Sequence, residues 1–258
     1  MSSAAEQLAA NMNFGAFSKA TELKKRLWFT LGALIVYRLG TYIPLPGIDP
    51  VVLDDIFSQQ SGGILGMFDM FSGGALGRMT IFALNIMPYI SASIIMQLMT
   101  SISPKLGALK KEGESGRKII NQYTRYGTVL ICTLQAYGIA VGLEGMTSSS
   151  GAAVIDPGGF FRFTTVVTLV GGTMFLMWLG EQIDEYGIGN GVSLIIMAGI
   201  VARMPRAVIY VIQNASIDVG GDAQMGPAKI VFLILAFVGV VAGSILITQG
   251  QRRIPIQQ

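Results

Sequence analysis

The feature that most constrains this chain is a series of long apolar runs with few or no ionised side chains. One of them, residues 79–98, has 20 residues and no Asp, Glu, Lys or Arg. A helix needs about 20 apolar residues to cross the hydrocarbon core of a bilayer. The chain is 52% hydrophobic and 13% charged, whereas a soluble domain is about 25% charged. These properties predict an all-α polytopic membrane protein.

Six runs are predicted to be transmembrane helices. They cover residues 27–43, 79–98, about 128–143, 160–179, 192–212 and 230–248. Pro88 is expected to kink the second helix, and Arg203, Pro205 and Arg206 to interrupt the fifth. A polar turn is expected between the fourth and fifth helices, at residues 181–191.

The start of the chain allows two interpretations. A charged segment followed by an apolar run is also typical of a signal peptide. Arg38 interrupts this run, however, and Pro44 and Gly47 stand where a cleavage site would be, so a retained helix is favoured. Beyond it, Asp49 and Pro50 predict the start of a short helix, with Asp49 as its N-cap.

Lys and Arg are distributed unevenly around the six runs. With both ends of the chain on one side, twelve of the 18 basic residues share that side: Lys19, Lys24, Lys25, Arg26, Lys105, Lys110, Lys111, Arg117, Lys118, Arg125, Arg252 and Arg253. Cytoplasmic loops carry the excess of Lys and Arg. Residues 1–26 are therefore predicted to be a cytoplasmic tail, and residues 249–258 to begin a cytoplasmic loop.

The segment before the second run is short and rich in glycine. Residues 62–77 carry Asp69 and are too few to cross a bilayer. Such a piece, joined to a full span, indicates backbone that dips to membrane depth inside protein or a water-filled cavity.

The distribution of ionisable residues disfavours several functions. All 15 Asp and Glu lie outside the six runs, whereas ion-coupled carriers need a carboxylate or His at membrane depth. Asp69 is the one candidate exception. The chain has no His, which removes His-based catalysis, and neither a cofactor nor a metal site is expected. The glycines of 187–191 look like a phosphate-binding loop, but they follow an apolar run instead of a strand, so a tight turn is favoured.

Two patterns remain open on the residues alone. The basic loop 105–126 is either a topology signal or a docking surface for a negatively charged partner. Ile86 and Ile90 are four residues apart and share a helix face, as do Val192 and Ile196. Apolar pairs of this kind in membrane helices normally face lipid or neighbouring helices.

Several long segments of the chain resemble one family. They include MFDMFSGGALGRMTIFALNIMPYISASIIMQ, KKEGESGRKIINQYTRYGT and GTMFLMWLGEQIDEYGIGNGVS. All are similar to the bacterial SecY family, the central subunits of the general protein-translocation channel. The resemblance implies a SecY-like helical bundle in which residues 27–212 are the first, five-helix half and residues 213–248 begin the second. The rest of the second half would lie beyond this sequence.

The resemblance also implies roles for individual residues. A plug would be formed by Gly62, Gly63, Ile64, Leu65, Gly66, Met67, Phe68, Asp69, Met70, Phe71, Ser72, Gly73 and Gly74. A hydrophobic pore ring would include Ile86, Ile90, Val192 and Ile196, and a lateral gate would include Ser91, Ile94 and Gln135. Cytosolic docking would use Lys110, Lys111, Arg117, Lys118, Arg125, Arg252 and Arg253.

The function that the resemblance implies is transport of unfolded proteins, without catalysis, in the bacterial inner membrane. The implied partners are the small membrane subunits SecE and SecG, the motor ATPase SecA, the ribosome, signal sequences, a YidC-type insertase and the lipid bilayer. A small-solute carrier or ion channel, or a non-conducting membrane scaffold, would be the alternatives. A carrier would require intramembrane carboxylates, and a scaffold would not need a plug.

Overall fold

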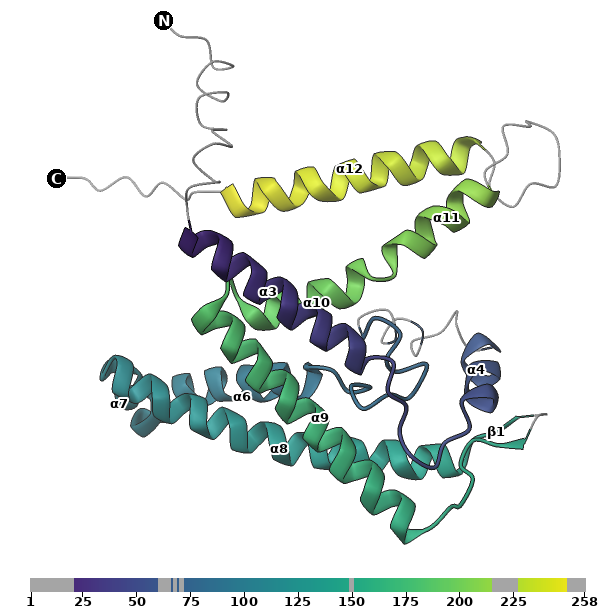
Figure 1. The fold of residues 1–258 in the computed structure, drawn as a ribbon. Coiled ribbons are helices and arrows are strands. Elements are labelled where there is room, and N and C mark those ends of the chain that lie inside the picture. The colour runs from purple at the N-terminus through teal and green to yellow at the C-terminus, as the bar shows by residue number, and fades with distance from the viewer. Residues whose placement is uncertain are drawn as a thin grey trace, which may run out of the picture. The chain divides into compact units, whose positions relative to one another are not determined.

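The computed structural model describes residues 21–59, 66, 69, 72–148, 151–214 and 227–249. The chain divides into two compact units, Met1–Arg203 and Met204–Gln258. Helices dominate both units (Figure 1).

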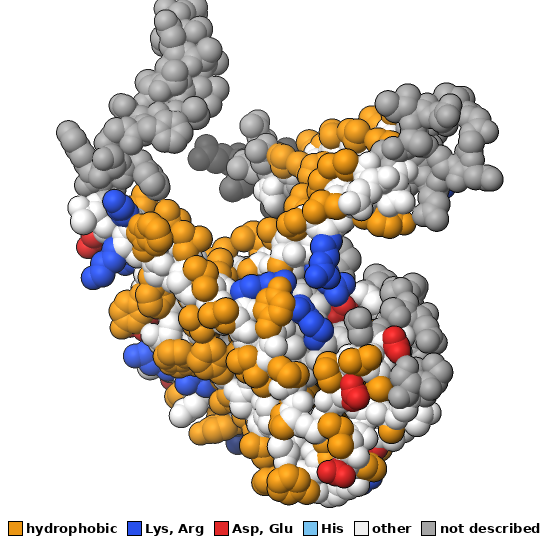
Figure 2. Space-filling model, turned by 45° about the vertical axis from the view of Figure 1, so that its right-hand side comes forward, with side chains coloured by type: hydrophobic (Ala, Val, Ile, Leu, Met, Phe, Trp, Pro, Cys, Tyr) orange, Lys and Arg blue, Asp and Glu red, His pale blue; other side chains and the backbone are white. Residues whose placement is uncertain are grey.

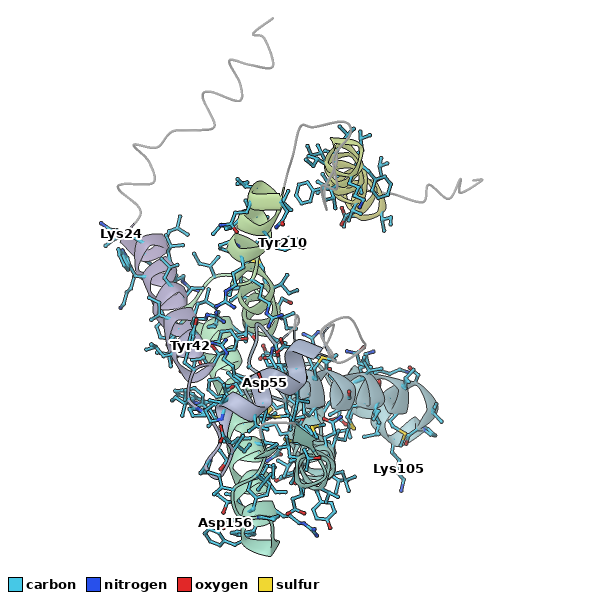
Figure 3. The ribbon with its side chains drawn as sticks, turned by 90° about the vertical axis from the view of Figure 1, so that its right-hand side faces the viewer. Lys24, Tyr42, Asp55, Lys105, Asp156 and Tyr210 are labelled. Atoms are coloured by element: carbon cyan, nitrogen blue, oxygen red, sulfur yellow. The ribbon has the colours of Figure 1, made fainter. Side chains whose placement is uncertain are left out.

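The first unit is a helical assembly with one small hairpin. Its elements are α3 Thr21–Gly40, α4 Pro50–Gln59, α6 Met87–Ile102, α7 Pro104–Lys111, α8 Glu114–Glu144, β1 Thr147–Ser148, β2 Gly151–Ala152, α9 Gly159–Tyr186 and α10 Gly191–Val201. Helix α8 packs against α6 and α9, and α9 also contacts α3 and α10 (Figure 1). Lys24 lies near the start of α3 and Tyr42 just past its end (Figure 3).

The second unit consists of α11 Met204–Asn214 and α12 Pro227–Gln249. The part of α12 from Lys229 to Thr248 has a mean hydropathy of 3.0, and none of it is buried. Such continuous exposure of apolar side chains is typical of a helix that faces lipid or other membrane helices. On the face drawn in Figure 2, hydrophobic side chains cover much of the surface.

Four helical stretches in the described part of the chain are long and apolar enough to cross a membrane. They are Glu114–Glu144, Gly159–Tyr186, Gly191–Asn214 and Lys229–Thr248. They confirm the predicted class of polytopic helical membrane protein. The first predicted span forms helix α3. This helix is not among the four stretches, because it also contains Lys24, Lys25, Arg26 and Arg38, which lower its mean hydropathy.

The prediction of a continuous second span was wrong. Residues 81–86 form turns, and helix α6 begins only at Met87. Pro88 does not kink α6 but starts it, because proline has no backbone N–H and fits the first turn of a helix. Met79 and Asn85 have positive φ angles, 41° and 49°, which a helix does not allow. The apolar side chains of this turn segment are buried in the protein core: Phe82 and Ile86 are 3% and 1% exposed.

Other predicted boundaries also differ. The predicted basic loop 105–126 is mostly helical, because α7 ends at Lys111 and α8 already begins at Glu114 instead of near residue 128. Helix α9 continues to Tyr186, so the predicted polar turn at 181–191 starts only at Gly187. The break in the fifth span is confirmed, since α10 ends at Val201 and α11 begins at Met204. The Asp49 cap is also confirmed: the Val51 N–H donates to Asp49 Oδ1 at 2.9 Å.

Two hydrophobic clusters form the core of the first unit. The first joins α4, the hairpin region, α8 and α9, with Leu53, Ala140 and Leu169 fully buried. The second joins α3, the 81–90 segment, α9 and α10, with Tyr37, Ile86 and Ile195 at its centre. The second cluster places the turn segment 80–86 beside the start of α10.

Candidate functional site

An apolar cavity of about 860 Å³ lies in the first unit. Its walls come from α4, the 72–91 segment, α8 and α10. Its lining residues are Phe57, Ser72, Leu76, Met79, Ala83, Leu84, Asn85, Ile86, Met87, Ile90, Ser91, Gln135, Gly138, Ile139, Gly142, Leu143, Met146 and Ile196. Most of these side chains are hydrocarbon, so the cavity offers an ion almost no ligands.

Three of the four residues predicted for the pore ring line this cavity. Ile86 is the last residue of the turn segment, Ile90 lies in the first turn of α6, and Ile196 lies in α10. The fourth, Val192, packs against the second core cluster together with Ile90. Segments about 100 residues apart in sequence thus bring the predicted ring residues into one region.

Two of the three residues predicted for the lateral gate line the cavity. Ser91 on α6 and Gln135 on α8 line the cavity, at the place where these two helices pack together. Ile94 does not line it; its side chain is 53% exposed on α6.

Of the predicted plug 62–74, the structure describes Gly66, Asp69, Ser72, Gly73 and Gly74, and the others lie outside the described residues. Asp69 and Ser72–Gly74 are buried, and Ser72 also lines the cavity. Gly73 and Gly74 have φ angles of 66° and 89°, a conformation that glycine adopts without a steric cost.

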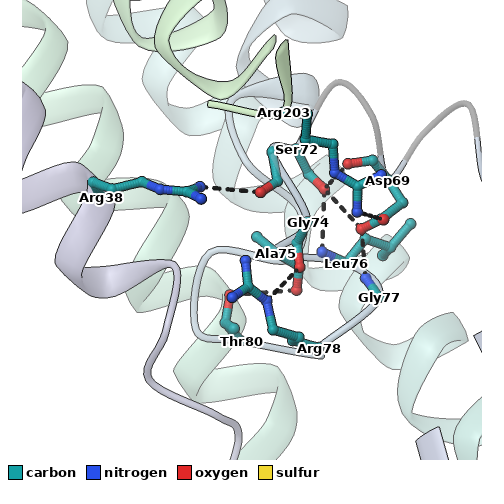
Figure 4. A network of polar contacts seen from close by, with 11 residues as sticks. Arg38, Asp69, Ser72, Gly74, Ala75, Leu76, Gly77, Arg78, Thr80 and Arg203 are labelled. Carbon is teal, nitrogen blue, oxygen red and sulfur yellow. Dashed lines mark hydrogen bonds and ion pairs between the residues drawn. The ribbon is translucent and has the colours of Figure 1, made fainter. Parts of the chain in front are cut away.

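A polar network holds this segment in place (Figure 4). Asp69 Oδ1 accepts the Gly77 N–H at 2.6 Å, and the Ser72 hydroxyl donates to the Asp69 carbonyl at 3.0 Å. The other carboxylate oxygen of Asp69 forms an ion pair with Arg203 Nη2. Asp69 is therefore a buried carboxylate with an internal counter-ion, which argues against a role in carrying a coupled ion.

Two further arginines hold the glycines of the network. Arg38 Nη1 donates to the Gly73 carbonyl and Arg78 Nε to the Gly74 carbonyl, each at 3.0 Å. Both guanidinium groups lie over the Tyr42 ring, at 5.0 Å and 4.3 Å from its centroid. The sequence alone does not reveal these roles, because no local pattern links Arg78 to Gly74 or Arg203 to Asp69.

Comparison with known proteins identifies the family. The family model SecY matches residues 80–258. The chain belongs to the SecY family. It is 55% identical over 240 residues to the protein translocase subunit SecY of Escherichia coli strain K12, covering 91% of this chain and 52% of that protein. It is 54% identical over 237 residues to that of Pseudomonas aeruginosa, covering 92% of this chain and 51% of that protein.

This SecY-family chain thus spans about half the length of the curated relatives it matches. Two solved structures share its fold. One is described as a protein conducting channel, with a TM-score of 0.57 and 21% identity over 85% of this chain and 47% of that one. The other is Sec61 in a canine ribosome–channel complex, with a TM-score of 0.58 and 20% identity over 91% of this chain and 50% of that one.

The basic residues predicted for docking in this SecY-family chain lie around the α7–α8 turn. Lys110 and Lys111 end α7, Arg117 and Lys118 lie in the first turns of α8, and all four are exposed. Arg125 differs from them, because its guanidinium forms a bidentate ion pair with Glu181 on α9, at 3.0 and 2.5 Å. Arg252 and Arg253 lie outside the described residues.

The first unit has no metal-binding chemistry in the part that the structure describes. No three or more Cys, Asp or Glu side chains gather there in a way that could hold a metal ion.

Proposed function

We propose that this chain forms one wall of a protein-conducting channel, in which unfolded polypeptides cross the membrane. The observation that carries the proposal is the apolar cavity lined by Ile86 of the turn segment, Ile90 of α6 and Ile196 of α10, beside the buried segment 72–74. The relatives named as protein translocase subunits support it. The remainder of the wall would come from sequence beyond this chain.

Apolar side chains suit a passage that must transmit protein but retain ions. A narrow hydrocarbon constriction resists ions by dewetting, since it replaces none of their hydration. Aliphatic side chains attract a passing chain through dispersion contacts, which have no preferred direction. Ile86, Ile90, Val192 and Ile196 are therefore proposed as this chain's share of the ring, with the plug 62–74 closing it.

Sideways release into lipid is the second part of the proposed function. Ser91 and Gln135 lie where α6 meets α8, and Ile94 lies on the outer surface of α6. These helices would separate to let a signal sequence or membrane segment leave. Such a segment gains roughly 25 cal/mol for each Å² of apolar surface that it removes from water, so an opening is sufficient and no bond needs to be broken.

The membrane placement and the partners are part of the same proposal. The excess of Lys and Arg supports placing both ends of this chain in the cytoplasm, and the bacterial relatives support the bacterial inner membrane. The exposed residues Lys110, Lys111, Arg117 and Lys118 would then face the cytosol and dock a motor ATPase such as SecA or the ribosome. SecE, SecG and a YidC-type insertase are proposed as membrane partners, and the energy would come from the motor or from translation.

Ion conductance in a planar bilayer tests the proposal. In a full-length channel that contains this chain, replacing Ile86, Ile90 and Ile196 with glycine should make the resting channel leak small ions. Leu98→Gly is the matched control, since Leu98 lies on the same helix α6 but is 58% exposed and away from the cavity. Equal conductance of the ring variant, the control and the parent channel would contradict the ring assignment.

A further inference from the structure

A cavity of about 450 Å³ lies where the start of α3 meets the end of α9, and it shares no lining residue with the apolar cavity. Arg26 Nη1 on α3 donates to the Gly187 carbonyl, directly after α9, so the two helices are joined at this point. The charged lining residues are Glu22, Lys25, Arg26 and Glu185, and the aromatic ones are Phe29 and Tyr186. We call this cavity the α3–α9 groove.

The charged side chains of the α3–α9 groove carry both signs but do not neutralise one another. Lys25 and Arg26 are positive, and Glu22 and Glu185 are negative. Arg26 follows Glu22 by four residues, a spacing at which opposite charges on a helix can pair. Among the described residues, however, none of the four forms an ion pair. Cations and carboxylates that face one cavity without pairing match a ligand that itself carries both charges.

The lining of the groove also indicates which two charged groups the ligand carries. The rings of Phe29 and Tyr186 lie edge to face, with their centroids 5.9 Å apart. Aromatic faces attract a cation, and carboxylates accept the N–H groups of a primary ammonium. The rings and the two carboxylates therefore suit an ammonium group. Lys25 and Arg26 suit a phosphate, which a guanidinium can bind with two parallel hydrogen bonds.

Exposed apolar side chains lie next to the groove on both helices. The apolar run of α3 starts directly after Arg26, and Trp28 and Leu31 on it are exposed. Helix α9 is long and apolar enough to cross a membrane, and Trp178, about two helical turns before Tyr186, is exposed as well. Tryptophan gathers at membrane–water interfaces. A polar groove with apolar surface beside it favours a membrane lipid over a soluble zwitterion, because the acyl chains cover that surface.

We propose that the α3–α9 groove binds a zwitterionic phospholipid with a phosphoethanolamine headgroup. Lys25 and Arg26 contact the phosphate, and Glu22, Glu185 and the Tyr186 ring contact the ammonium. An anionic phosphoglycerol headgroup fits poorly, because it has no ammonium and the two carboxylates repel it. A phosphocholine headgroup also fits poorly, since its quaternary nitrogen has no N–H to donate to a carboxylate. The inference goes beyond the proposed function, because lipid binding here does not depend on transport through the apolar cavity.

Lipid retention by a full-length channel that contains this chain tests the site. The channel is incubated in detergent with equal amounts of phosphatidylethanolamine, phosphatidylglycerol and phosphatidylcholine, and native mass spectrometry counts the bound lipids of each class. We expect the parent to retain a phosphatidylethanolamine that Lys25→Gln and Glu185→Gln lose. Each substitution should weaken its binding about tenfold, because each removes a charge-assisted hydrogen bond to the headgroup.

Lys24→Gln is the matched control, since Lys24 is an exposed lysine next to Lys25 that does not line the groove. It should retain phosphatidylethanolamine as the parent does. Glu185→Lys gives a sharper result, because three cations and one carboxylate would then surround the groove. Its retained lipid should change from phosphatidylethanolamine to phosphatidylglycerol. All the substituted side chains are exposed, so these variants keep the packing between α3 and α9.

Three results would overturn the lipid site. They are equal retention of the three headgroups by the parent, equal loss of phosphatidylethanolamine in Lys24→Gln and Lys25→Gln, and an unchanged headgroup preference in Glu185→Lys. None of them bears on the ion leak of the isoleucine variants, so the lipid site can fail while the proposed channel stands, and the reverse.

Discussion

Adjacent glycines in α9 provide a sharp test of how the turn segment 80–86 is held. A Cβ on Gly172 would lie 2.1 Å from the Ile81 carbonyl oxygen and 3.3 Å from the Phe82 ring, whereas a Cβ on Gly171 meets nothing within 4 Å. The obstacle at Gly172 is backbone, so no change of rotamer relieves it. Gly172→Ala must move the segment that carries Ile86, and Gly171→Ala need move nothing.

The expected cost of Gly172→Ala is about 1–3 kcal/mol, the usual range for overpacking a well-packed interior. Gly171→Ala should be neutral or stabilise by up to about 1 kcal/mol, because it removes the conformational entropy cost of glycine in a helix. In a protein of about 150–250 residues, 1 kcal/mol shifts the melting temperature by about 2–4 °C.

Thermal unfolding of the two variants in detergent, at one scan rate, measures the difference. We expect Gly172→Ala to melt several degrees below the parent channel and Gly171→Ala to melt at or above it. Equal melting temperatures for the two variants would refute the close approach of α9 to the turn segment.

Three further outcomes follow from contacts outside the cavity. Glu144→Gln should speed protease cleavage of the loop between α8 and α9. Glu144 forms an ion pair with the Arg162 guanidinium, and the substitution removes the charge on which that pair depends. Asp184→Ala should lower the free energy of unfolding by about 1 kcal/mol, because it removes the oxygen that accepts the Gly191 N–H at 2.6 Å. Lys111→Glu should weaken co-sedimentation with the cytosolic motor or ribosome, because Lys111 is exposed at the end of α7, and should leave thermal stability unchanged.

Each of these outcomes has a result that contradicts it. Unchanged cleavage of Glu144→Gln would show that the ion pair does not hold the loop. An unaltered melting temperature for Asp184→Ala would mean that water replaces the hydrogen bond at no cost. Normal co-sedimentation of Lys111→Glu would leave the basic loop with its topology role alone.

Apolar composition predicted the class of the protein but not the path of its backbone. Runs without charges must be buried in lipid or in protein, and this requirement locates α9, α12 and the end of α8 closely, whereas α8 begins at Glu114, inside the predicted basic loop. The same reasoning fails for residues 79–86, because a buried turn segment is as apolar as a transmembrane helix. Asn85 has a positive φ, and Ile81 and Phe82 of the same segment lie against Gly172 of α9; neither feature leaves a periodic signal in the sequence.

The candidate site was predictable only in part for a similar reason. Ile86 and Ile90, four residues apart, could be assigned to one helix face, but their meeting with Ile196 depends on how α6 and α10 pack. Asp69 could be singled out as a lone acid among glycines, whereas its partner Arg203 lies 134 residues away. Spacing identifies neighbours along one helix; it carries no information about a partner on another element.

Photocrosslinking to a polypeptide stalled during translocation tests the central claim most directly. The photoreactive residue replaces Ile90 or Ile196, which both line the cavity, in a full-length channel that contains this chain. Val167 is the control position, because it lies on α9, is 54% exposed and does not line the cavity. We expect strong adducts between the stalled polypeptide and the two cavity positions, and none at Val167. Adducts at Val167 alone, or equal adducts at all three positions, would contradict a passage through this cavity.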